Sequence, residues 1–372
     1  MPCWITTQSG RAFSSAHSPE ISTAKAGASS LAATIAATAL AGLGKEAHAQ
    51  APKSPKIKWR LQTYAGTTLG QHVIKPSIDA FNIAANGEMV IELYYADQIV
   101  PQGELIRALQ RGILDAVQTD EDSAQSPVDV SIFGAYFPFA TTYSLDVPTL
   151  WRWYGLDKIW QEAYAKVPNV TWLSTGSWDP CNFATTKPIR SLKDLKGLRV
   201  YMFPTGGQFM RRFGVIPVSL PYEDVQMAIQ TGELDGVSWS GITEVYTVGW
   251  ADVTKYYLTN PISGAWAGSY LVNTKRWEAL PKHLQELFKL CIDSSHYYRL
   301  HWYWWGEAHY RVKGGKLKLT SIPESEWNTV RKEALKFWDE VAKKSPRTAR
   351  VVKILKEYNE IMTKAGPPYR YA

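Results

Sequence analysis

The sequence lacks the residue patterns of the widespread catalytic and cofactor-binding motifs. It contains no Gly-x-Ser-x-Gly nucleophile elbow, no Gly-Lys-Ser/Thr phosphate loop and no Gly-x-Gly-x-x-Gly dinucleotide loop. The few histidines are not spaced as His-Glu-x-x-His, so we expect no metal and no cofactor. Because an enzyme usually shows a nucleophile, a metal site or a phosphate grip, the sequence argues against catalysis.

Cysteine is scarce, with Cys3, Cys181 and Cys291 as its three occurrences. The absence of Cys-x-x-Cys excludes zinc ribbons and thioredoxin-like redox motifs. Cys3 lies in a segment that we expect to be removed. The sequence leaves open whether Cys181 and Cys291 form a disulfide, because their separation along the chain says nothing about their distance in space.

The positive charge is not concentrated in any one stretch. The net charge of +7 results from 41 Lys and Arg against 34 Asp and Glu, and the two signs are mixed along the chain. A nucleic-acid-binding protein would gather its positive charge on one stripe, so we expect no nucleic-acid partner. With 45% hydrophobic residues over 372 positions, the chain is long enough for two α/β lobes with substantial cores.

Long hydrophobic runs are missing except near the N-terminus. There Lys25 precedes an apolar run over residues 29–43, and Ala47 and Ala49 supply the small-x-small pattern of a signal-peptidase site. This order predicts a cleavable signal peptide over residues 1–49 and a periplasmic location. The alternative interpretation is a buried, alanine-rich helix.

The rest of the chain alternates predicted strands and helices. Residues 57–64 and 89–95 read as strands on either side of a helix over 72–86, which predicts parallel pairing through a right-handed crossover. Beyond residue 273 the chain is expected to be helical to its end. Residues 295–310 of that part are dense in aromatics, and we expect this helix to be buried between other elements.

Two segments of the chain resemble each other. GELIRALQRGILDAV (103–117) and YEDVQMAIQTGELDGV (222–237) each comprise an acid-led helix, a glycine stop, Leu-Asp and a short strand. This internal similarity predicts two lobes of similar construction.

Several motifs resemble the DctP-type solute receptors of tripartite ATP-independent periplasmic (TRAP) transporters. They are IVPQGELIRALQRGILDA (99–116), KPIRSLKDLKGLRV (187–200), GVIPVSLPYEDVQMAIQTGELDGVSW (214–239) and the spaced group Asn273, Trp277, Leu280 and Pro281. They follow one another in the family's order across most of the chain.

The resemblance implies a two-lobed α/β clamshell of the periplasmic-binding-protein kind, with a long bridging helix. Lobe I would comprise residues 57–176 and 264–285, and lobe II residues 177–263 and 286–372 with the C-terminal helices. The resemblance implies binding without catalysis, a small organic acid as ligand, and a small and a large TRAP membrane subunit as partners. We expect the receptor to be a monomer.

The sequence departs from the family where the ligand is held. Relatives grip a carboxylate with an arginine four residues after a glycine, and counting from Gly197 this position is Tyr201. Arg199 lies two residues earlier, on the same face of the strand. Relatives that bind keto acids hold a metal with Glu and Gln, where this chain has Ser238 and Pro180, so we expect no metal there.

The motif matches place Tyr201 and Trp239 in the pocket, as rings that combine an apolar body with a polar tip. Further candidates come from strand ends and from the loop YFPFATT: Tyr64, Glu121, Phe139, Trp178 and Asn182. The number of aromatic residues near these positions favours an aromatic or otherwise apolar acid.

Two other functions are compatible with the same sequence. A periplasmic sensor subunit that presents a ligand to a membrane kinase would share the fold, and a neighbouring histidine-kinase gene would indicate it. An enzyme on a receptor-like fold would be indicated by chemical change of the bound ligand.

Overall fold

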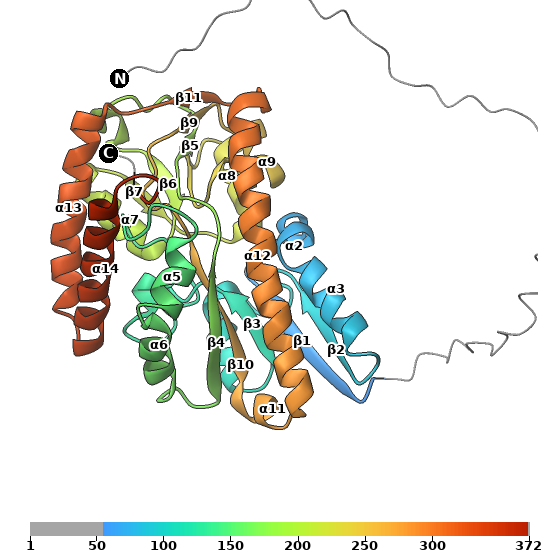
Figure 1. Cartoon of the computed structure of the whole chain (residues 1–372). Coiled ribbons are helices and arrows are strands. Elements are labelled where there is room, and N and C mark those ends of the chain that lie inside the picture. Colours follow the sequence, from blue (N-terminus) through green and yellow to red (C-terminus); the bar gives the residue numbers. More distant parts are fainter. Residues whose placement is uncertain (1–54, 371–372) are drawn as a thin grey trace, which may run out of the picture. The chain divides into compact units, whose positions relative to one another are not determined.

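The chain forms two mixed β-sheets joined by long connections (Figure 1). The structure is a computed structural model and describes residues 55–370. The predicted signal peptide, residues 1–49, lies outside the described residues. None of the helices within 55–370 combines the length and the hydropathy needed to cross a membrane.

The first sheet has the strand order β2-β1-β3-β10-β4. Its strands are β1 (Ile57–Thr63), β2 (Met89–Tyr94), β3 (Ala116–Thr119), β4 (Val170–Ser177) and β10 (Ala267–Asn273). β1 pairs in parallel with both β2 and β3, while β10 runs antiparallel to β3 and β4. The predicted parallel strand–helix–strand unit is therefore confirmed.

The helix predicted over 72–86 is two helices, α2 (Thr67–Val73) and α3 (Lys75–Ala84). Ile74 lies between them outside the helical region, and Pro76 occupies the first turn of α3. Because proline has no backbone N–H, it is tolerated in a first turn and favours a new helix start there.

The second sheet has the order β11-β9-β5-β8-β6-β7. Its strands are β5 (Ala184–Thr185), β6 (Arg199–Met202), β7 (Ile216–Val218), β8 (Gly236–Ser238), β9 (Tyr256–Leu258) and β11 (Lys318–Thr320). The chain passes between the sheets from β4 to β5 and from β9 to β10. Helix α12 (Lys282–Lys313) contacts elements associated with both sheets.

The internal similarity predicted from the sequence corresponds to matching contacts. After α4 (Leu105–Gln110), Asp115 accepts a hydrogen bond from the Arg60 N–H at 2.8 Å. After α8 (Val225–Gln230), Asp235 accepts one from the Arg199 N–H at 2.9 Å. The Arg199 guanidinium also donates to Asp235 at 3.1 Å. This contact holds Arg199 at the helix-to-strand turn, so it does not replace the missing family arginine.

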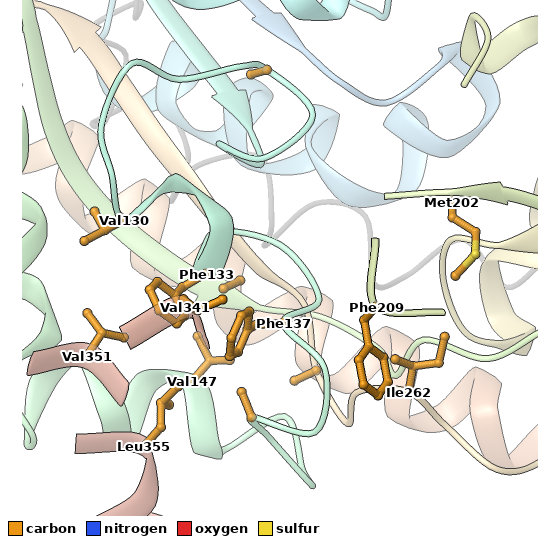
Figure 2. Packing of buried hydrophobic residues seen from close by; sticks show 14 of the residues in the cluster. Val130, Phe133, Phe137, Val147, Met202, Phe209, Ile262, Val341, Val351 and Leu355 are labelled. Atoms are coloured by element: carbon orange, nitrogen blue, oxygen red, sulfur yellow. The ribbon is translucent and has the colours of Figure 1, made fainter. Parts of the chain in front are cut away.

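A large apolar core lies where α5 (Asp146–Arg152) and α6 (Leu156–Tyr164) meet α13 (Glu324–Ala342) and α14 (Pro346–Ala365). Figure 2 shows Phe133, Phe137, Val341 and Val351 together with other side chains of this core. The C-terminal helices thereby cover side chains that come from residues 133–164.

Truncating Phe137 to alanine is expected to cost about 3–5 kcal/mol of unfolding free energy, the usual range for a buried aromatic ring. The ring is 2% exposed and lies 4.5 Å from Phe133 and 5.9 Å from both Phe337 and Trp338, measured between ring centroids. Urea unfolding followed by circular dichroism measures the loss. A loss below about 1 kcal/mol would mean that the C-terminal helices do not depend on this contact.

One sequence prediction about α12 is wrong. The aromatic-rich stretch 295–310 was expected to be buried on all sides, but Tyr297, Trp304 and Trp305 are 69%, 67% and 53% exposed. Only one face of the helix, including Ser295, Arg299 and Tyr303, is buried. Both the buried and the exposed face of this helix carry aromatic rings, so composition alone does not show which face is buried.

Candidate ligand-binding site

A second apolar cluster gathers aromatic rings at the strand ends of both sheets and on α12. We call it the aromatic cage. Its eleven rings are Tyr64, Tyr136, Trp178, Tyr201, Phe203, Tyr222, Trp239, Trp250, Tyr257, Trp266 and Tyr303, and all are buried.

Trp239 stacks against two rings, Tyr201 in the neighbouring strand β6 and Phe203 directly after it. Its centroid lies 4.5 Å from that of Tyr201 with a 19° interplanar angle, and 3.7 Å from that of Phe203 with a 17° angle. Tyr201 and Phe203 share a face because alternate residues of extended chain point the same way. The strand geometry thus presents two rings to one indole.

The first sheet supplies the opposite part of the cage. Trp178 follows β4, and its indole N–H donates to the Tyr64 hydroxyl at 3.2 Å. Trp266 packs against both rings, with centroids 4.3 Å from Trp178 and 5.0 Å from Tyr64. The Arg299 guanidinium, from α12, lies 4.0 Å from the centre of the Trp178 ring.

Two carboxylates lie among these rings. Glu244, in α9 (Ile242–Thr247), accepts hydrogen bonds from the Tyr222 hydroxyl at 2.8 Å and the Tyr303 hydroxyl at 3.2 Å. Asp179 accepts from the Tyr136 hydroxyl at 2.8 Å and from a backbone N–H at 2.6 Å. Each side chain is about 1% exposed.

Neither carboxylate forms an ion pair with a residue between 55 and 370. Glu307 pairs with Arg311 at 3.5 Å, and Arg299 donates instead to the Tyr270 hydroxyl at 2.8 Å and to the Val73 carbonyl.

Burial is the main cause that raises the pKa of Glu244 to about 7. Burial, followed by the charge of Glu244, also raises the pKa of Asp179 well above its usual range. A bound cation would offset this cost and favour the ionised form of a carboxyl.

A cavity of about 230 Å³ borders the cage. Tyr201, Tyr222 and Trp239 form part of its wall, together with Asp97 and Gln102 from the first half of the chain. Tyr222 thus borders this cavity and at the same time donates its hydroxyl hydrogen bond to Glu244. At roughly 30 Å³ per water molecule, the space suits a small solute.

Four of the seven residues expected at the site lie in the cage: Tyr64, Trp178, Tyr201 and Trp239. The other three lie outside this cluster. Glu121 is buried in the first half of the chain, where it accepts a hydrogen bond from the Trp160 indole at 3.0 Å. Burial raises its pKa to about 8.

Phe139 and Asn182 have other neighbours. The Phe139 ring packs near Phe209 and Trp327, with centroid distances of 6.3 and 6.0 Å. The Asn182 amide donates to the Leu258 carbonyl at 3.0 Å. Phe139 therefore packs against α13, and Asn182 ties the segment before β5 to the end of β9.

Asp179, Glu244 and Arg299 were not among the residues that the sequence predicted for the site. Asp179 directly follows a predicted pocket residue, which was a signal available in the sequence. Glu244 and Arg299 lie on helices at positions that no motif marks, and only the packing of α9 and α12 brings them to the cage.

Within residues 55–370, no group of three or more His, Cys, Asp or Glu side chains is arranged to hold a metal ion. Cys181 and Cys291 are both free thiols. Cys181 lies 3.4 Å from the Ser238 hydroxyl.

The sequence pattern of the bacterial extracellular solute-binding protein family 7, DctP, matches residues 63–345. The chain belongs to this family. A TRAP periplasmic solute-binding protein from Chromohalobacter salexigens, solved with bound (S)-(+)-2-amino-1-propanol, is 61% identical with a TM-score of 0.84. That match covers 86% of this chain and 100% of the other.

More distant relatives share the architecture. A monocarboxylate 2-oxoacid-binding periplasmic protein of Nostoc is 26% identical over 298 residues, which are 78% of this chain and 80% of that protein. A TRAP receptor from Pseudoalteromonas atlantica with bound sodium and pyruvate is 18% identical, with a TM-score of 0.74 over 83% of this chain and 95% of that one. This last likeness shows the fold.

The family membership settles the broad function. This DctP protein is a TRAP periplasmic receptor that binds a small solute and works with TRAP membrane subunits, and it is not an enzyme. The two-sheet architecture with its long helix is the two-lobe fold of these receptors.

Proposed function

We propose that this receptor binds a small protonated amine, of the amino-alcohol class, and delivers it to its TRAP membrane subunits. The observation that carries the proposal is the pair of buried carboxylates, Asp179 and Glu244, which form no ion pair within 55–370 and are surrounded by aromatic rings. An ammonium group satisfies both features, because it pairs with a carboxylate and is attracted to ring faces.

The ligand bound in the crystal structure of the 61% identical receptor supports this class, since (S)-(+)-2-amino-1-propanol carries one ammonium and one hydroxyl. We propose Tyr64, Trp178, Tyr201 and Trp239 as walls of the site, with Glu244 and Asp179 as the groups that attract the charge. Tyr201 then stands where carboxylate-binding relatives carry arginine because a guanidinium there would repel an amine.

The lobe boundaries belong to the same proposal. Lobe I comprises 57–176 and 264–285, lobe II comprises 177–263 and 286–372, and the cage lies where they meet. Asp122, which follows β3, accepts hydrogen bonds at 2.8 Å from both the N–H and the hydroxyl of Thr205, which follows β6. Such contacts are candidates for those that form when the lobes close.

A small organic acid is the second candidate, and Arg299 favours it. This guanidinium is fully buried, and its Nη1 has no hydrogen-bond partner within 55–370. An unpaired buried donor is costly, and a ligand carboxylate would accept from it.

A thermal-shift screen separates the two candidates. We expect small amino alcohols to raise the melting temperature, because a ligand that binds the folded protein stabilises it. Acids of matched size, such as pyruvate and lactate, should produce no shift. Shifts with acids alone would refute the amine proposal and move the assignment to Arg299.

A further inference from the structure

One guanidinium group of α12 reaches the aromatic cage with part of its hydrogen-bonding capacity unused. Arg299 is fully buried, its Nη2 donates to the Tyr270 hydroxyl at 2.8 Å, and its Nε donates to the Val73 carbonyl. Both acceptors are neutral groups, and Nη1 has no hydrogen-bond partner within residues 55–370. Because a buried donor without an acceptor costs free energy, this nitrogen favours a ligand atom that accepts from it.

A second donor of the same kind lies beside Arg299. The Trp266 indole is 1% exposed, and its Nε1 also has no partner in the described part of the chain. The Trp266 ring lies 4.3 Å from the Trp178 ring between centroids, and the Arg299 guanidinium lies 4.0 Å from the centre of the same Trp178 ring. Two donors that pack against one indole favour an oxygen atom, which has two lone pairs to accept from them.

The hydroxyl of Tyr64 lies between these donors and the carboxylates. It accepts from the Trp178 indole at 3.2 Å. Burial and the charge of Glu244 raise the pKa of Tyr64 well above its usual value, and so does the charge of Asp179, whereas the charge of Arg299 lowers it. Negative and positive groups therefore act on the same small part of the cage.

Helix α12 connects the Arg299 donor to the carboxylate side of the cage. Tyr303 follows Arg299 by four residues on the same buried face, about 6 Å further along the helix axis. The Tyr303 hydroxyl donates to Glu244 at 3.2 Å. The unused donor and the carboxylate thus lie within the reach of one small molecule that has a polar group at each end.

We propose that Arg299, together with Trp266, recognises the hydroxyl oxygen of the amino alcohol, so that the receptor selects ligands that carry an oxygen next to the ammonium. This inference rests on the proposed function, which assigns the ammonium to Glu244 and Asp179. Two of the three Arg299 nitrogens already donate within the protein. The one that remains suits the single oxygen of a hydroxyl better than the two oxygens of a carboxylate, which a guanidinium binds through paired donors.

Isothermal titration calorimetry with two amines tests the inference. Isopropylamine is 2-amino-1-propanol without its hydroxyl, and we expect the wild-type protein to bind it at least about tenfold more weakly, the usual effect of losing a hydrogen bond to a charged group. Arg299→Met keeps a long unbranched side chain but removes the donor. It should weaken the binding of (S)-2-amino-1-propanol about tenfold, whereas isopropylamine should bind unchanged or more tightly because a positive charge has been removed.

Two further variants complete the design. Arg152→Met is the matched control, because Arg152 also contacts α12, through Asp293 at 2.6 Å, but its side chain is 60% exposed and lies outside the cage. It should keep the full preference for the amino alcohol. Trp266→Phe keeps a buried ring and removes the second donor, so it should reduce the preference severalfold, and it tests the same contact should Arg299→Met fail to fold.

Equal binding of the two amines by the wild-type protein would overturn the inference and leave the proposed function intact. Binding of neither amine would refute the proposed function, and the inference with it. Tighter binding of alanine than of the amino alcohol would also overturn the inference and would assign Arg299 to a ligand carboxylate. A preference for the amino alcohol that survives both Arg299→Met and Trp266→Phe would show that these donors do not recognise the hydroxyl.

Discussion

Replacing Glu244 by glutamine is expected to weaken the binding of (S)-2-amino-1-propanol by about 100-fold or more. The substitution keeps the size of the side chain but removes the charge that attracts the ammonium. Removing one partner of a buried ion pair costs about 3–5 kcal/mol, and each 1.4 kcal/mol changes the dissociation constant tenfold. Isothermal titration calorimetry measures the change directly.

The variant should remain folded. The glutamine carbonyl still accepts a hydrogen bond from Tyr222 or Tyr303, and a buried charge without an ionic partner has been removed.

Glu121→Gln is the matched control, since Glu121 is an equally buried carboxyl with a raised pKa outside the cage. The affinity of the Glu121→Gln variant for (S)-2-amino-1-propanol should stay within about threefold of the wild-type value. Equal losses in the two variants would mean that Glu244 acts through general stability instead of through the ligand.

The affinity for the amine is expected to fall about tenfold for each pH unit below 7 and to level off above it. Burial raises the pKa of Glu244 from its ordinary value of 4.5 to about 7, so its carboxyl is largely protonated at pH 6. An ammonium binds the ionised form, and binding below pH 7 must therefore release a proton. A negatively charged ligand, such as an organic acid, would instead bind more tightly as the pH falls.

The raised pKa of Glu244 also determines how the stability of the ligand-free protein changes with pH. Between pH 4.5 and about 7, Glu244 is neutral in the folded protein but ionised in the unfolded chain. The ligand-free protein therefore loses stability from this group as the pH rises through that window, and the stabilisation by an amine grows over the same window.

Titrations at pH 5.5, 6.5 and 7.5, each in two buffers of different ionisation enthalpy, count the protons that binding releases. We expect release of close to one proton per ligand at the lowest pH and less at the highest. An affinity that does not change between pH 5.5 and 7.5 would contradict the role of Glu244. Glu121→Gln should keep the same pH dependence, which excludes that carboxyl as its source.

Much of the fold follows from local sequence patterns. The strands β1 and β2 were predicted to within a residue or two, because alternation of side chains and a clear helix between them leave one topology. The internal similarity also held, down to the aspartates Asp115 and Asp235 at the two helix-to-strand turns. The break at Ile74 was missed because apolar periodicity continues across it.

The sequence predicted some of the residues that the structure gathers in the aromatic cage and not others, and this difference has a physical cause. Tyr201 and Trp239 lie at strand ends, where motif and topology both indicate a cleft. Glu244 and Arg299 reach the cage from helices, so their positions depend on tertiary packing that no local pattern encodes. The two candidate ligand classes have different sources: the acid was inferred from the family resemblance, and the amine is proposed from the charges that packing brings together.

Which face of α12 is exposed to solvent also could not be predicted from the sequence. Rings at positions 295–310 occur on all sides of the helix, so the pattern gives no apolar stripe and no polar stripe. Only the contacts of Tyr303 and Arg299 with the cage decide which side is buried.

The most direct test of the cage is a calorimetric comparison of three ligands of nearly equal shape on the wild-type protein. (S)-2-amino-1-propanol carries a positive charge, 1,2-propanediol is neutral and lactate is negative. We predict that the amine binds at least about 100-fold more tightly than the diol and that lactate shows no binding, because buried Glu244 and Asp179 favour a cation. Equal binding of the amine and the diol, or tighter binding of lactate, would contradict the account.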